Sequence, residues 1–220
     1  MENLIFLLII PICLVSYSGL KDVLFKEKYI FNTDEILINK EYFRLITSGF
    51  LHANWLHLAF NMLALSSFGS FIIIKYGLIN FSLLFLGSLL GGSLLSLFIH
   101  RNHENYRALG ASGAVSGIIF STIVSEPFSK VSFLLLPAGF PAWAIGIAYI
   151  IISIYGIKKN NDNIGHDAHL GGAVFGIIGT LFINPQSFSD NFWVYALLGI
   201  PSIGFILFIV KNTTYLMFDS

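Results

Sequence analysis

Long apolar runs alternate with short polar segments along almost the whole chain. The runs cover residues 3–17, 55–74, 78–99, 112–124, 142–157, 166–183 and 192–210. Most of them approach the length of about 20 residues that a helix needs to cross a hydrocarbon core of about 30 Å. The pattern predicts an all-α polytopic membrane protein with seven membrane-embedded helices.

The run at residues 112–124 is too short to span. With a rise of about 1.5 Å per residue, a helix of this length reaches only about 20 Å. One of its ends must therefore begin inside the membrane, where irregular backbone is tolerated only if it is buried in protein or lines a water-filled cavity. We expect the end at Ser112 to open into such a cavity.

Two further segments interrupt the helical pattern. Residues 18–53 mix charged, aromatic and aliphatic side chains, so we expect them to fold against the bundle or to lie at the membrane interface. Residues 131–140 are apolar but contain proline and glycine, which disfavour a helix interior. The next helix is therefore expected to begin near Ala142.

The composition agrees with an integral membrane protein. Of 220 residues, 55% are hydrophobic and 11% are charged, whereas soluble domains carry about 25% charged residues. The formal net charge is zero and no basic block occurs, so nothing indicates a nucleic-acid partner. The single cysteine, Cys13, excludes an intramolecular disulfide. The N-terminus lacks the positive flank of a cleavable signal, so the first run is expected to be a retained span.

The parity of the crossings brings distant polar residues to one side of the membrane. If every run crosses, the second, fourth and sixth runs begin on the same side. His57 and Asn61 then lie near Ser112 and His169 at that side, and the four-residue spacing puts His57 and Asn61 on one helix face.

Glycines predict which of these helices pack together. A pair spaced four residues apart follows both Ser112 and His169, and such pairs let two helix backbones approach closely. The glycines are Gly113, Gly117, Gly172 and Gly176. We infer that the fourth and sixth helices pack against each other and bring Ser112 near His169.

These residue types fit acyl transfer. A serine hydroxyl needs a neighbouring base to take its proton, and histidine is the usual base. The backbone amide of Ser112 and the side chains of His57 and Asn61 are the candidate donors to the oxyanion, each worth about 3 to 4 kcal/mol. Asp167 lies on a different helix face from His169, which predicts a Ser-His dyad rather than a triad.

Four short motifs lie between residues 43 and 176. In chain order they are Phe43-Arg44, His52-x4-His57-x3-Asn61, Gly110-Ala111-Ser112-Gly113 with Gly117, and Ala168-His169-Leu170-Gly171-Gly172 with Gly176. Their order and spacing resemble those of the rhomboid intramembrane serine proteases.

The resemblance implies a six-helix catalytic core in residues 1–183, with residues 184–220 forming a link and a seventh transmembrane helix. It implies Ser112 as nucleophile, His169 as general base, and His57, Asn61 and the Ser112 amide as oxyanion hole. Substrates would be membrane-anchored proteins in the lipid bilayer, and no metal or cofactor would be needed. The motifs do not specify an oligomeric state.

Two features depart from this expectation. The family often has an aromatic residue four positions after the nucleophile, where this chain has Ser116, which leaves open what holds the His169 ring. Lys and Arg also gather on the Ser112 side, which the positive-inside rule would place in the cytoplasm. The resemblance implies a site that opens to the extracytoplasmic side, and we expect that orientation because residues 18–53 balance their cations with Asp and Glu.

Other interpretations of the same residues remain open. A serine before glycine in a membrane helix also serves close packing. We expect His52 to brace the first loop, His166 to be a loop or capping residue, and His100 and His103 to be solvated. Alternative functions are an inactive rhomboid-like factor that binds or routes membrane proteins, and a metal or proton transporter built on His52, His57, His166 and His169.

Overall fold

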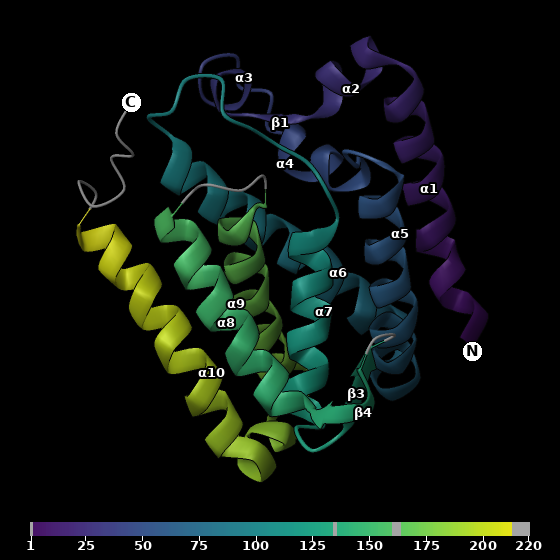
Figure 1. Ribbon diagram of the computed structural model, residues 1–220, viewed down its shortest axis with the longest axis vertical. Coiled ribbons are helices and arrows are strands. Elements are labelled where there is room, and N and C mark those ends of the chain that lie inside the picture. The colour runs from purple at the N-terminus through teal and green to yellow at the C-terminus, as the bar shows by residue number, and fades with distance from the viewer. Residues whose placement is uncertain (1, 134–135, 160–163, 213–220) are drawn as a thin grey trace.

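The computed structural model describes residues 2–133, 136–159 and 164–212, and within these it is a helical bundle (Figure 1). Five helices there are long and apolar enough to cross a membrane: Asn3–Lys21, Trp55–His100, Ala142–Lys159, His166–Ile183 and Pro185–Lys211. The predicted all-α polytopic fold is confirmed.

The helix Trp55–His100 contains two of the predicted runs. It comprises α5 (Trp55–Ala64), a π-helical stretch (Leu65–Gly69) and α6 (Ser70–His100). Its 46 residues are about twice the length of a span. The backbone turns at Gly77, whose φ of 84° is a left-handed conformation that favours glycine.

The short helix α7 (Ser112–Ser125) lies inside the bundle, where it packs on α6 and α9 (His166–Ile183) (Figure 1). All its residues from Gly113 to Ser125 are buried except Ile119. The outer positions belong to α1 (Phe6–Lys21) and α10 (Pro185–Lys211) (Figure 1). A helix enclosed in this way does not need the length that a lipid-facing span requires.

Helices α7 and α9 touch through their backbones, as the glycine spacing predicts. A Cβ atom on Gly172 would lie 1.9 Å from the carbonyl oxygen of Gly113, and one on Gly176 would lie 2.1 Å from that of Gly117. Neither position can carry a side chain unless the helices separate. The predicted packing of these two helices is confirmed.

The segment before α5 folds against the bundle. It forms α2 (Val23–Tyr29), β1 (Phe31–Asn32), α3 (Thr33–Leu37), α4 (Arg44–Thr47) and a 3₁₀ turn (Ser48–Phe50), and β1 pairs with β2 (Arg107–Ala108).

The buried guanidinium of Arg44 ties this segment together. It donates to the carbonyls of Glu27 and Ile30 at 2.8 and 2.9 Å and to the carboxylate of Glu41 at 2.6 Å. Its burial is tolerated because acceptors take three of its five N–H donors and one of them is a carboxylate.

Two local features differ from the sequence expectation. Residues before α8 (Ala142–Lys159) form an antiparallel pair, β3 (Lys130–Phe133) and β4 (Leu136–Pro141), which the apolar composition does not distinguish from a loop. The link before the last span is helical, and α10 begins at Pro185 with a break at Asn191. Proline fits the first turn of a helix because its missing N–H needs no partner there.

A methyl group added at the α7–α9 contact tests this packing. We expect Gly176→Ala to lower the melting temperature in detergent, since overpacking costs about 1 to 3 kcal/mol. Gly204→Ala in α10 is the matched control, because nothing lies within 4 Å of a Cβ there. Equal melting temperatures for the two variants would contradict the contact.

Candidate active site

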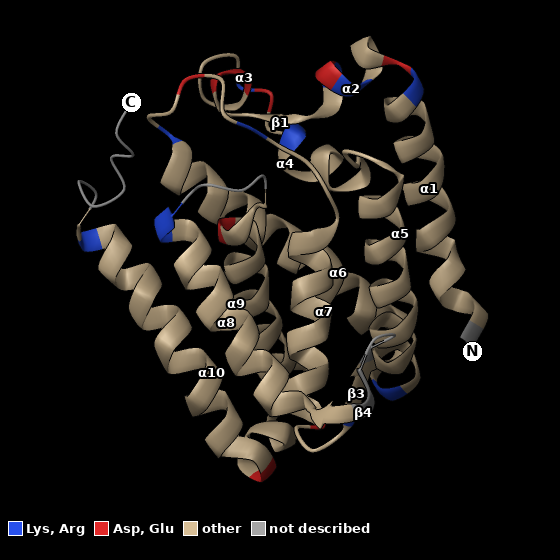
Figure 2. Cartoon of the chain, viewed as in Figure 1, with Lys and Arg blue, Asp and Glu red and all other residues tan. Residues whose placement is uncertain are grey.

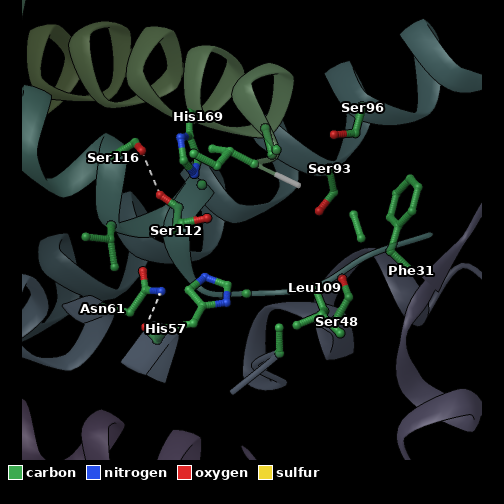
Figure 3. A pocket seen from close by; sticks show the side chains of 18 of the residues that line it. Phe31, Ser48, His57, Asn61, Ser93, Ser96, Leu109, Ser112, Ser116 and His169 are labelled. Atoms are coloured by element: carbon green, nitrogen blue, oxygen red, sulfur yellow. Dashed lines mark hydrogen bonds between the residues drawn. The ribbon is translucent and has the colours of Figure 1, made fainter. Parts of the chain in front are cut away.

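A cavity of about 840 Å³ lies where α5, α6, α7, α8 and α9 converge (Figure 3). Its lining includes His57, Asn61, Ser112 and His169, which belong to three different helices. The sequence predicts that these four residues lie at one side of the membrane, because the second, fourth and sixth apolar runs begin on the same side, and the cavity brings them together.

Ser112 is the first residue of α7, and a tight turn presents it. Gly110 has a φ of 131°, and a Cβ atom there would lie 2.7 Å from Cε1 of His57 and 3.7 Å from Oγ of Ser112. Only glycine fits between these two side chains. The N–H of Gly110 donates to the carbonyl of Ser48 at 3.0 Å, which holds the turn in place.

The position of Ser112 at a helix start also supplies donors. The first N–H groups of an α-helix have no intrahelical acceptor, and the helix dipole favours negative charge at this end. A developing oxyanion beside Ser112 would therefore meet backbone donors that are already oriented.

His169 lies one turn into α9 and points into the same cavity as Ser112 (Figure 3). At this level the two helices approach closely, because a Cβ atom on Gly113 would lie 3.1 Å from the carbonyl oxygen of Ala168. The backbone contact between α7 and α9 therefore places the hydroxyl and the imidazole in the lining of one cavity.

His57 and Asn61 line the cavity on the α5 side (Figure 3). Asn54 caps this helix by accepting the N–H of His57 at 2.8 Å. The side-chain amide of Asn61 donates one N–H to the carbonyl of His57 at 3.0 Å, and an amide carries a second N–H. The second N–H of Asn61 and the His57 ring are the candidate side-chain donors opposite His169.

His52 does not line the cavity but braces the turn that precedes Ser112. It is 1% exposed. Its Nδ1 lies 2.7 Å from Oγ of Ser16, which donates to the carbonyl of Phe50, and its Nε2 accepts the N–H of Ala111 at 3.4 Å. Because the single hydroxyl proton of Ser16 goes to Phe50, Nδ1 of His52 must donate to Oγ of Ser16, while Nε2 accepts. The ring is therefore neutral, with its proton on Nδ1. Burial, followed by the nearby His57, lowers the pKa of His52 to about 3.

Asp167 is turned away from the candidate dyad. Its carboxylate accepts from Ser96 at 2.5 Å and lies 3.3 Å from Nε2 of His100. The His100 ring stacks on Tyr106 with centroids 3.5 Å apart. His100 is 4% exposed, so its expected solvation is wrong: α6 extends to this residue, and the ring is enclosed between Tyr106 and Asp167.

His166 packs against α8 rather than lining the cavity that holds Ser112. A Cβ atom on Gly156 would lie 2.1 Å from the His166 ring. Within the described ranges, no three His, Cys, Asp or Glu side chains are grouped as metal ligands would be.

Tyr149 of α8 also lines the cavity, although no sequence motif points to it. Its ring centroid lies 5.9 Å from that of His169, and its hydroxyl lies 2.5 Å from Oγ of Ser116. The only signal was chemical, since a tyrosine in the middle of an apolar run needs a hydrogen-bond partner when buried.

Comparison with known proteins gives a consistent result. The family model for the Rhomboid domain matches residues 39–186. Rhomboid protein 1, mitochondrial, of Saccharomyces cerevisiae is 31% identical over 70% of this chain and 45% of its own length. Rhomboid protease GluP of Bacillus subtilis is 29% identical over 78% of this chain and 29% of its own length. The chain therefore spans less than half the length of these relatives.

The depressed pKa of His52 predicts acid sensitivity. The unfolded chain binds a proton near pH 6.5 that the folded protein does not accept until about pH 3, so stability falls as pH decreases through this interval. We expect the melting temperature of the wild type to fall more between pH 7 and pH 4 than that of His52→Gln, whose amide does not titrate. A parallel decline in both proteins would refute the assignment.

Proposed function

The chain belongs to the rhomboid family, and on that premise we propose that it is an intramembrane serine endopeptidase. It would hydrolyse peptide bonds in or near transmembrane segments of membrane-anchored proteins. The observation that carries the proposal is one cavity that holds Ser112 and His169 on one side and His57 and Asn61 on the other (Figure 3).

The first half of the proposed reaction forms an acyl-enzyme. Oγ of Ser112 attacks the scissile carbonyl carbon while His169 takes the hydroxyl proton. The carbonyl oxygen becomes an oxyanion that the Ser112 amide and the side chains of His57 and Asn61 stabilise. The C–N bond then breaks, and the amine leaves with the proton from His169.

The second half regenerates the serine. His169 takes a proton from water, the resulting hydroxide attacks the ester carbonyl, and Oγ of Ser112 leaves and recovers a proton from His169. This step needs water inside the membrane. The cavity at the start of the short helix α7 supplies a place for it, since irregular backbone at this depth is compatible with a wet cavity.

We place the catalytic core in residues 1–183. Among the residues that the structure describes, the cavity lining ends with α9 and takes no residue from α10. The last helix would then support the fold without entering the chemistry.

The charge distribution bears on the proposed orientation. Charged side chains gather at the end of the molecule that carries α2, α3 and α4 (Figure 2). Some of these cations are paired within the folded segment: Arg44 with Glu41 at 2.6 Å and Arg107 with Glu27 at 2.8 Å. Because these cations are paired with carboxylates, the excess of Lys and Arg at this end is weaker evidence for orientation than the family relationship. We therefore propose that the cavity opens to the extracytoplasmic side.

Cleavage of a reporter with one transmembrane segment, measured in detergent with purified protein, tests the function. We expect Ser112→Ala and His169→Ala to abolish cleavage and Asn61→Ala to lower kcat by about 10² to 10³, the effect of losing one oxyanion donor. Ser82→Ala is the control, because Ser82 is exposed and bonds only locally to the carbonyl of Leu78.

A fluorophosphonate probe provides an independent measurement on the same proteins. It should label the wild type and Ser82→Ala but not Ser112→Ala. Cleavage by Ser112→Ala at the wild-type rate would refute the mechanism. A wild type that neither cleaves nor reacts would favour the inactive membrane-protein-binding alternative.

Orientation can be measured with single cysteines in a Cys13→Ser background. An impermeant thiol reagent applied outside intact cells should label Glu104→Cys, near the start of α7, and spare Lys130→Cys, at the other end of that helix. Labelling at Lys130→Cys alone would reverse the proposed orientation.

A further inference from the structure

Tyr149 lies at the centre of α8, and its side chain reaches across to both α7 and α9. Its ring contacts Phe120 of α7 with centroids 5.4 Å apart and His169 of α9 with centroids 5.9 Å apart. It also lines the cavity that contains Ser112. One side chain therefore touches the two helices that carry the candidate nucleophile and base.

The hydroxyl of Tyr149 begins a directed chain of hydrogen bonds. Ser116 has a single proton, which it donates to the carbonyl oxygen of Ser112 at 2.7 Å. Its oxygen must then accept the proton of Tyr149 at 2.5 Å. The tyrosine hydroxyl is thus connected, through one intermediate, to the first turn of α7.

Asp167 lies two residues before His169 in the sequence, but its carboxylate does not orient the His169 ring. Asp167 does not line the cavity: its carboxylate accepts from Ser96 at 2.5 Å and lies 3.3 Å from Nε2 of His100. The contacts that α8 makes through Tyr149 lie on the cavity side. This distribution points to an aromatic ring, rather than an acid, beside the imidazole.

We propose that Tyr149 is a positioning residue, which holds the His169 ring with its aromatic face and the first turn of α7 with its hydroxyl. The inference rests on the proposed proteolytic function. An imidazole rotates about two bonds, so a ring packed beside it restricts the orientations from which it can take the Ser112 proton. An aromatic face within about 6 Å also attracts the cationic imidazolium that this proton transfer creates.

The two parts of the side chain have separable effects. Tyr149→Phe keeps the ring and should lower kcat by about 5-fold, the effect of losing one hydrogen bond. Tyr149→Leu removes the ring and should lower kcat by about 100-fold, as small displacements of catalytic groups do. In both variants KM should stay within about 2-fold of the wild type, because Tyr149 is expected to act on the chemical step and not on substrate binding.

A double-mutant cycle tests the hydrogen-bond chain. If Tyr149 acts through Ser116, the combined Tyr149→Phe, Ser116→Ala variant should lose less activity than the product of the two single losses. Tyr155→Leu is the control on the same helix, since Tyr155 is 60% exposed on the surface of α8 and should keep wild-type kcat. Melting temperatures of all variants are measured alongside, and those of Tyr149→Phe and Tyr155→Leu should match.

The outcomes separate this inference from the proposed function. If the wild type cleaves and Tyr149→Leu cleaves equally fast, the positioning role is overturned and the protease stands. A rise in KM without a fall in kcat assigns Tyr149 to substrate binding and also overturns it. If the loss of kcat follows the loss in melting temperature, and Tyr149→Phe is as inactive as Tyr149→Leu, Tyr149 has a structural role only and the positioning role is overturned. A wild type that neither cleaves the reporter nor reacts with the probe overturns both.

Discussion

The backbone contact between α7 and α9 is the constraint on which the rest of the structure depends. Gly172 and Gly176 lie so close to the carbonyls of Gly113 and Gly117 that a side chain at either position would separate the helices. Without hydrophobic driving force between helices in lipid, such close packing is a main source of their association. The same contact brings Ser112 and His169, which are distant in the sequence, to one cavity.

A second set of contacts fixes the turn that precedes Ser112. The N–H groups of Gly110 and Ala111 are bonded to Ser48 and to the His52 ring, so residues 48–52 act as a support for the turn. This support works only while His52 is neutral, because one ring nitrogen must accept while the other donates. Burial favours that state, because it lowers the pKa of the His52 ring.

The titratable groups of α9 are divided between two environments. Asp167 and His100 form a buried pair next to Tyr106, while His169 faces the cavity with Tyr149. The division follows from helix geometry, since residues two apart lie on different faces. The acid therefore anchors α9 to α6, and the histidine faces the cavity.

The sequence by itself determined the approximate limits of most of the apolar helices, the short helix that begins at Ser112 and the glycine contact with α9. These depend on local quantities: the length of an apolar run and the absence of a side chain. It also predicted that His57, Asn61, Ser112 and His169 lie at one side, because parity is a property of the chain order.

Only the tertiary structure decided which faces turn inward. Lipid and protein interior are both apolar, so a helix that is hydrophobic all round carries little periodic signal about its orientation. The burial of His100, the strand pair β3–β4 and the approach of Tyr149 to His169 and Ser116 all depend on how separate elements are rotated and placed against one another. No single run of residues encodes that information.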